Sequence, residues 1–144
     1  MPTASRAIVI ARPPADVFAY VADGTTAPQW RPGVLDVALE SGTGLGARYR
    51  QGVRGPGGRR IAADYVVTAW EPDRRLAFAA TAGPVRPTGE YVLEVVEGGT
   101  RLTFSLDAKL GGLKGVLMGG AVQKTMDAEM AALDTLKSAL ERGT

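Results

Sequence analysis

The sequence predicts an α+β fold in which a curved, seven-stranded antiparallel sheet wraps around a long C-terminal helix. Apolar and polar residues alternate with period two through most of residues 34–110, in runs separated by glycine and proline turns. After residue 120, apolar residues instead recur every three or four positions, as on one face of a helix. A sheet with one apolar face and a helix with one apolar stripe are both buried when the stripe lies across the sheet.

The N-terminal third of the chain is expected to contribute one strand and one helix. Residues 5–12 alternate like a strand, and the prolines that follow end it. Pro14 suits the first turn of a helix over residues 14–22, because proline needs no hydrogen bond at that position. The segment around Trp30 is then a short irregular or helical connector that leads into the sheet.

The remaining elements follow from the change of period. Strands are expected at residues 34–41, 47–54, 59–70, 74–80, 89–96 and 100–110. In the strand at 89–96, Tyr91, Leu93 and Val95 are expected to face inward. The final helix presents the apolar stripe Val122, Met126, Met130, Leu133, Leu136 and Leu140. Residues 111–120 contain five glycines and are interpreted either as a mobile gate over a cavity or as a passive turn.

Composition excludes several classes of function. The 144 residues contain no cysteine and no histidine, which removes disulfides, thiol catalysis, thiolate zinc sites and the usual general base. The net charge is only +2 with both signs interspersed, so no nucleic-acid partner is expected. No apolar run is long enough to span a membrane. The sequence therefore favours a cytoplasmic domain over residues 1–144 that needs no metal and no cofactor, as a monomer or homodimer.

Four polar side chains fall on the inward face of the expected sheet. Tyr49, Gln51, Tyr65 and Tyr91 each occupy an inward position of the alternation. A buried hydroxyl or amide without a partner costs roughly 1–3 kcal/mol. These groups therefore either bond to one another and to buried water, or line a cavity and meet a ligand. An apolar cavity with a few convergent polar groups is the usual form of a small-molecule site, and this favours the cavity.

The connector carries a tryptophan and an arginine side by side. Trp30 either forms one lip of the cavity or plugs the end of the core. Arg31 either offers its guanidinium to a carboxylate or phenolate of a ligand or points to water.

Several stretches of the chain resemble one protein family. They are PPADVFAYVADGTTAPQWRPGV, ARYRQ, YVVTAWEPDRRLAF, GTRLTF and LKSALE. In this order they are similar to the polyketide cyclase/dehydrase and lipid-transport family of the START-related SRPBCC superfamily. The resemblance implies the helix-grip fold, with two short helices between the first and second strands. It also implies a hydrophobic ligand between the sheet and the C-terminal helix. Polar pocket residues vary within the family, so no catalytic set is implied.

Two main hypotheses follow. The first is a binding protein for a lipid, a polyketide or another ring-containing metabolite; the second is an aromatase/cyclase or dehydratase that acts through pocket tyrosines without a metal. A third is a surface-interaction domain with a filled core. The expected ligand-binding residues are Trp30, Arg31, Tyr49, Gln51, Tyr65, Phe78, Tyr91, Phe104, Met118, Val122, Met126 and Met130.

Overall fold

A computed structural model describes residues 3–83, 85–108 and 112–142, and the side chains of residues 56 and 112–121 lie outside the described part. The elements are β1 (Thr3–Ile10), α1 (Pro14–Ala22), the 3-10 helix η1 (Gly24–Gln29), β2 (Val34–Ser41), β3 (Arg48–Arg54), the 3-10 turn η2 (Pro56–Gly58), β4 (Arg60–Ala62), β5 (Tyr65–Glu71), β6 (Arg75–Ala80), β7 (Thr88–Val96), β8 (Gly99–Asp107), α2 (Gly112–Ala131) and α3 (Leu133–Arg142).

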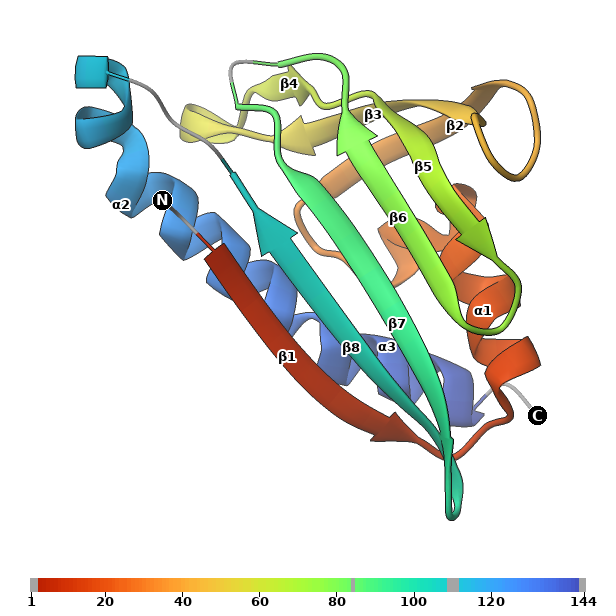
Figure 1. The fold of residues 1–144 in the computed structure, drawn as a ribbon. Coiled ribbons are helices and arrows are strands. Elements are labelled where there is room, and N and C mark those ends of the chain that lie inside the picture. Colours follow the sequence, from red (N-terminus) through yellow and green to blue (C-terminus); the bar gives the residue numbers. More distant parts are fainter. Residues whose placement is uncertain (1–2, 84, 109–111, 143–144) are drawn as a thin grey trace.

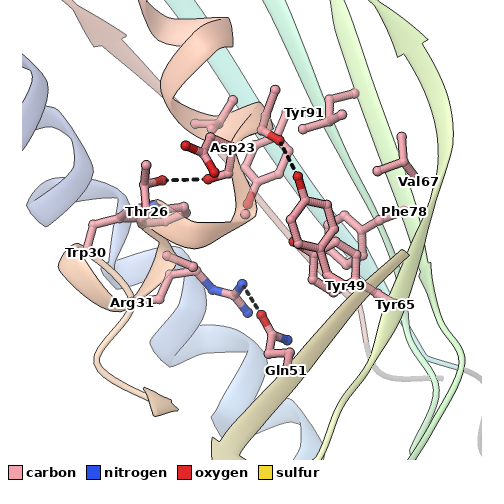
Figure 2. Close-up of a pocket in the computed structure, with 15 residues that line it drawn as sticks. Asp23, Thr26, Trp30, Arg31, Tyr49, Gln51, Tyr65, Val67, Phe78 and Tyr91 are labelled. Carbon is pink, nitrogen blue, oxygen red and sulfur yellow. Dashed lines mark hydrogen bonds between the residues drawn. The ribbon is translucent and has the colours of Figure 1, made fainter. Parts of the chain in front are cut away.

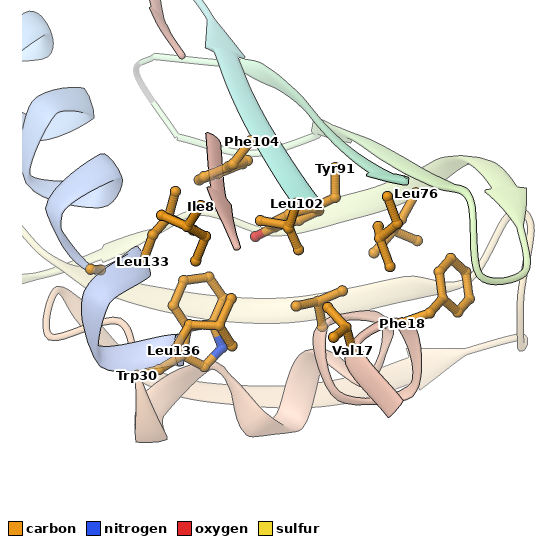
Figure 3. Packing of buried hydrophobic residues seen from close by; sticks show 14 of the residues in the cluster. Ile8, Val17, Phe18, Trp30, Leu76, Tyr91, Leu102, Phe104, Leu133 and Leu136 are labelled. Carbon is orange, nitrogen blue, oxygen red and sulfur yellow. The ribbon is translucent and has the colours of Figure 1, made fainter. Parts of the chain in front are cut away.

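The strands form one antiparallel sheet in the order β1-β8-β7-β6-β5-β3-β2, with β4 paired to β3 off this path. Figure 1 shows α2 and α3 running along the same side of the sheet as α1. This confirms the α+β architecture, the two short helices after the first strand and the long C-terminal helical segment. The hydrophobic core lies between the helices and the sheet, where Leu102, Phe104, Leu133 and Leu136 are fully buried (Figure 3).

The sheet has eight strands because the stretch expected as one strand at 59–70 is interrupted. The backbone N–H of Gln51 donates to the Asp64 carboxylate at 3.1 Å, and Ala63 N–H donates to the Gln51 carbonyl at 2.8 Å. The Asp64 carboxylate accepts the Gln51 backbone N–H, which would otherwise donate to a backbone carbonyl of the neighbouring strand. The interruption separates β4 from β5.

The C-terminal helical segment differs from expectation at its start and within its apolar stripe. It begins at Gly112, so residues 112–120 are helical rather than a turn, and residue 111 lies outside the described part. Each glycine costs roughly 1 kcal/mol relative to alanine in a helix, and the rest of the fold overrides that local preference here. The helix is also broken between α2 and α3, at Ala132.

One inward assignment is wrong. Val95 is 80% exposed, although Tyr91 and Leu93 on the same strand are buried. Val95 lies close to the hairpin at Gly98-Gly99, and Figure 1 shows this β7–β8 end projecting past the rest of the sheet. The alternation continues there, but the Val95 side chain lies outside the core cluster that buries Tyr91 and Leu93.

The short helices are held in place by local hydrogen bonds. Pro14 begins α1, as expected. The Asp23 carboxylate caps η1 by accepting from Thr25 N at 3.0 Å, and the Thr26 hydroxyl donates to the Tyr20 carbonyl at 2.8 Å. These contacts fix η1 against α1 and so position the residues that follow it.

Candidate functional site

Five aromatic rings form a continuous row across neighbouring strands. Tyr49 on β3 stacks on Tyr65 of β5 with centroids 5.0 Å apart, and Phe78 of β6 lies 5.5 Å from Tyr65. Tyr91 of β7 lies 6.3 Å from Phe78 and stacks on Phe104 of β8 at 4.4 Å. Each ring comes from an inward position of its strand, so the period-two pattern brings them together. Such pairs contribute roughly 0.5–1.5 kcal/mol each beyond area burial, and together the five rings form one continuous wall.

A hollow of about 40 Å³ lies between this wall and the α1–η1 segment (Figure 2). The sheet side of the hollow is lined by Tyr49, Gln51, Tyr65, Val67, Leu76, Phe78 and Tyr91. The helical side includes Val21, Ala22, Gly24, Ala27, Trp30 and Arg31. A volume of this size holds about three water molecules, whereas ligand pockets usually span roughly 300–1,000 Å³. A drug-sized ligand would therefore need the walls to move apart.

Arg31 is held at the edge of the hollow by an ion pair with α2. Its backbone N–H donates to the Ala27 carbonyl at 2.8 Å, at the end of η1. Its guanidinium donates to both carboxylate oxygens of Glu129, at 2.8 and 3.0 Å. The two side chains are only 14% and 15% exposed. Arg31 Nη1 also donates to the Gln51 amide oxygen at 3.4 Å, and its guanidinium lies 5.9 Å from the Trp30 ring.

The ionisation of these groups follows from burial and pairing. Burial alone lowers the pKa of Arg31, but Glu129 more than offsets this, so the pKa lies above its ordinary value and the guanidinium stays charged. Burial raises the pKa of both Tyr65 and Tyr91 above the ordinary value for a phenol, although Arg31 acts in the opposite direction. Both hydroxyls are therefore protonated at neutral pH and available as hydrogen-bond donors.

Gly24 sets how closely η1 approaches the aromatic wall. A Cβ atom at this position would lie only 2.8 Å from a ring carbon of Tyr49, and closer still to the Tyr65 hydroxyl. Glycine is therefore the residue that lets η1 close over these two rings.

The structure brings seven of the expected site residues together around the hollow. These are Trp30, Arg31, Tyr49, Gln51, Tyr65, Phe78 and Tyr91. Trp30 is 3% exposed and belongs both to the core and to the hollow's wall. Arg31 does not point to water. Whether any of these residues binds a ligand stays a prediction.

The other expected site residues lie elsewhere. Phe104, Met126 and Met130 are buried in the core beneath the C-terminal helices, and Val122 packs against that core. None of these four is among the described residues that line the hollow. The side chain of Met118 lies outside the described part. The core residues therefore have a packing role in this structure, and a ligand contact from them stays a prediction.

Glu129 is a site residue that the sequence analysis does not include. It lies three residues after Met126 and four before Leu133. That spacing places it on the apolar stripe, and a charged residue there is a signal for a buried partner.

Within the described residues, no cluster of three or more His, Cys, Asp or Glu side chains is arranged to hold a metal ion. None of the helices in the described ranges is long and apolar enough to cross a membrane.

Comparison with known proteins identifies the family. A family model described as polyketide cyclase / dehydrase and lipid transport matches residues 1–141. The chain belongs to this family. An uncharacterised Mycobacterium tuberculosis protein is 31% identical over 103 residues, a stretch that covers 69% of this chain. The same stretch covers only 60% of the mycobacterial protein's length.

Solved structures share this fold over almost the whole length of the chain. A Thermus thermophilus protein superposes with a TM-score of 0.83 at 20% identity, covering 99% of both chains. A START superfamily protein from Mycobacterium smegmatis gives 0.77 at 16% identity over 99% of this chain and 99% of its own. The Zhui aromatase/cyclase from Streptomyces gives 0.75 at 16% identity over 97% and 93%. At these identities the likeness shows the fold alone.

Proposed function

We propose that this protein binds one hydrophobic small molecule, such as a lipid, a polyketide or another ring-containing metabolite, in the hollow between the sheet and the helices. One observation carries the proposal: polar groups meet inside a space that is otherwise walled by aromatic and aliphatic side chains. The guanidinium of Arg31 and the amide of Gln51 are paired within the chain, whereas the Tyr65 and Tyr91 phenols have no hydrogen-bond partner among the described residues. A buried phenol is costly without a partner, and an apolar space with a few polar groups is typical of a ligand site. The name of the family, which includes lipid transport, supports a hydrophobic ligand.

The small volume of the hollow makes binding a two-step event in this proposal. The Arg31–Glu129 ion pair joins the segment after η1 to α2, and Gly24 holds η1 against the tyrosines. Ligand entry requires one of these contacts to open. The energy of the ligand's buried apolar surface, at about 25 cal/mol per Å², would offset that opening.

The proposal is tested by titrating the protein with Nile red, an uncharged dye whose fluorescence rises in apolar surroundings. We expect saturable binding of one dye per chain. Val67 is 4% exposed and lines the hollow, so Val67→Phe should fill it and weaken dye binding at least tenfold. The matched control is Val95→Phe on the exposed end of β7, which should bind normally. A flat titration of the folded wild-type protein would refute the proposal.

An enzymatic role is the second candidate, favoured by the protonated phenols in the hollow. Tyr65 and Tyr91 could each donate a hydrogen bond to a carbonyl and polarise it for attack by a carbon nucleophile, as an aromatase/cyclase or dehydratase requires. The Streptomyces protein, which is an aromatase/cyclase, has a similar fold. Incubation with a linear poly-β-ketone, followed by mass spectrometry for a cyclised product that has lost water, tests this role. Binding without turnover would contradict the enzymatic role and support the binding role.

The proposed function also includes a cellular location and an oligomeric state. The fold contains no cysteine and needs no oxidising compartment, which fits a cytoplasmic location. We propose that residues 1–144 act as one ligand-binding domain, as a monomer or homodimer, without metal or cofactor.

A further inference from the structure

The sheet edge formed by β2, β3 and β4, opposite β1, carries the whole positive excess of the chain (Figure 1). Residues 34–64 contain five arginines and three carboxylates, which gives +2, the net charge of the entire protein. All five arginines are exposed; they are Arg48, Arg50, Arg54, Arg59 and Arg60. Positive charge is therefore concentrated at this edge, whereas basic and acidic residues balance in the remainder of the chain.

Three of these arginines have no acidic partner. Arg60 pairs with Asp36, and Arg50 lies 3.8 Å from Glu40. Among the described residues, no carboxylate pairs with the other three, which are Arg48, Arg54 and Arg59. Arg54 also lies directly opposite Arg60 in the β3–β4 register, where like charges repel each other. An anion from outside the chain would relieve this repulsion.

Exposed leucines lie at the same edge. Five large apolar side chains are exposed among the described residues, and three of them belong to β2 or to the loop after it: Leu35 at 38%, Leu39 at 47% and Leu45 at 67%. Since β2 is the last strand of the described sheet, these side chains are accessible from the edge. The edge therefore presents apolar side chains close to cations that have no partner.

This combination of charge and apolar surface favours one kind of partner. At an anionic bilayer, arginines contact the lipid phosphates while leucines enter the boundary between headgroups and acyl chains. A single-stranded nucleic acid would need exposed aromatic rings for stacking, but β4 has none and Tyr49 of β3 is buried towards the hollow. A second copy of the chain would bring the same positive charge against itself.

We propose that the β2–β4 edge docks the protein on an anionic lipid bilayer, with Arg48, Arg54 and Arg59 at the phosphates and Leu45 in the apolar boundary below them. This inference goes beyond the proposed function and does not depend on whether the hollow binds a ligand. Docking at this edge would also bring the hollow close to the bilayer, because Tyr49 of β3 lines the hollow.

Flotation of the full chain with lipid vesicles tests the proposal. Vesicles of phosphatidylcholine alone are compared with vesicles that contain about 30% phosphatidylglycerol. We expect binding to the anionic vesicles only, and weaker binding as salt rises from about 0.05 M to about 0.5 M, because salt screens exposed charges. The Arg48→Gln/Arg54→Gln/Arg59→Gln variant should bind roughly tenfold more weakly or worse, since each cation near such a surface strengthens binding about fivefold.

The matched control removes three exposed cations from other parts of the chain, as Arg86→Gln/Arg101→Gln/Lys124→Gln. Both triple variants change the net charge from +2 to −1, so only the position of the lost charges differs. The control should bind within about twofold of the wild type, because charges beyond the Debye length are screened. Leu45→Ser should weaken binding roughly threefold or more, whereas Val95→Ser, at a position that is 80% exposed on β7, should not.

Unfolding curves verify that each variant folds. Binding to neutral and anionic vesicles alike, or equal losses in the two triple variants, would overturn the assignment of this edge. Binding to duplex or single-stranded DNA without binding to vesicles would assign the arginines to a nucleic acid instead, and a wild-type dimer that Leu45→Ser dissociates would assign the edge to a second copy; either result refutes the proposal.

Nile red titration without vesicles measures the hollow separately. If vesicles are not bound but the dye is, the docking inference fails and the proposed function stands. If the anionic vesicles are bound but the dye titration is flat, the proposed function fails and the docking inference stands.

Discussion

Arg31 and Glu129 lie 98 residues apart in the chain and form a bidentate ion pair that is about 85% shielded from solvent, with exposed fractions of 14% and 15%. The pair joins the end of η1 to α2 at the edge of the hollow. A pair of this kind contributes little net energy when intact, but removing one partner leaves a buried charge unpaired.

We expect Glu129→Gln to lower the free energy of unfolding by about 3 kcal/mol, because the amide keeps the shape of the carboxylate but leaves Arg31 uncompensated. The matched control is Asp36→Asn. Asp36 and Arg60 form the same bidentate geometry, but their side chains are 55% and 45% exposed, so the loss should stay below about 1 kcal/mol. Urea unfolding measures both. Equal losses would mean that the Arg31–Glu129 pair behaves as a surface pair.

The contact between η1 and the aromatic wall predicts the effect of a single methyl group. Gly24→Ala places a Cβ into the Tyr65 hydroxyl and the Tyr49 ring, and should cost about 1–3 kcal/mol while displacing those rings into the hollow. Gly33→Ala is the control, because its Cβ would meet nothing within 4 Å. Its stability should change by no more than about 0.5 kcal/mol. A Gly24→Ala variant as stable as Gly33→Ala would show that η1 moves freely.

Met126 distinguishes packed core from ligand space. It is 4% exposed and lies outside the described lining of the hollow, so Met126→Trp should overpack the core and cost on the order of 1–3 kcal/mol. Ala128→Trp, on the exposed side of α2, is the control and should leave stability nearly unchanged. Thermal unfolding with and without Nile red is the measurement. A Met126→Trp variant that keeps its melting temperature but loses dye binding would place the ligand under α2 instead.

The raised pKa of two tyrosines predicts a loss of stability at alkaline pH. Tyr65 and Tyr91 keep their protons in the folded chain at a pH where unfolded tyrosines, with a pKa of 10.0, release them. Their contribution is therefore complete below about pH 10 and is lost as the pH rises towards the folded pKa. The drop in unfolding free energy between about pH 8 and about pH 11 should be smaller in the Tyr65→Phe/Tyr91→Phe double variant. Parallel pH curves for the two proteins would contradict this assignment.

The sheet and most of the hollow's aromatic wall could be predicted because they depend on local alternation. Tyr49, Tyr65 and Tyr91 share one face simply because each lies at an inward position of its strand. Val95 follows the same alternation and is exposed, because coverage by a helix is a tertiary property that the pattern does not contain.

The parts of the site that depend on contacts between distant elements could not be predicted. To predict the ion pair between Arg31 and Glu129, one must know which turn of α2 faces the end of η1. The start of α2 at Gly112 could not be predicted, because residues 111–120 contain five glycines and glycine disfavours a helix. The volume of the hollow depends on how closely Gly24 lets η1 approach Tyr65, and no sequence period encodes that distance.

Entry of a ligand into the hollow beside Trp30 can be measured by contact quenching of tryptophan fluorescence. Trp30 lines the hollow, whereas Trp70 packs edge-on against Phe18 at 5.2 Å and is not among the described lining residues. Bromobenzene, an apolar molecule that quenches indole on contact, is titrated into Trp70→Phe and Trp30→Phe proteins. We expect saturable one-to-one quenching in Trp70→Phe, which retains Trp30, and none in Trp30→Phe. Quenching that is linear in both variants, or that saturates only when Trp70 is the remaining tryptophan, would contradict entry of the ligand beside Trp30.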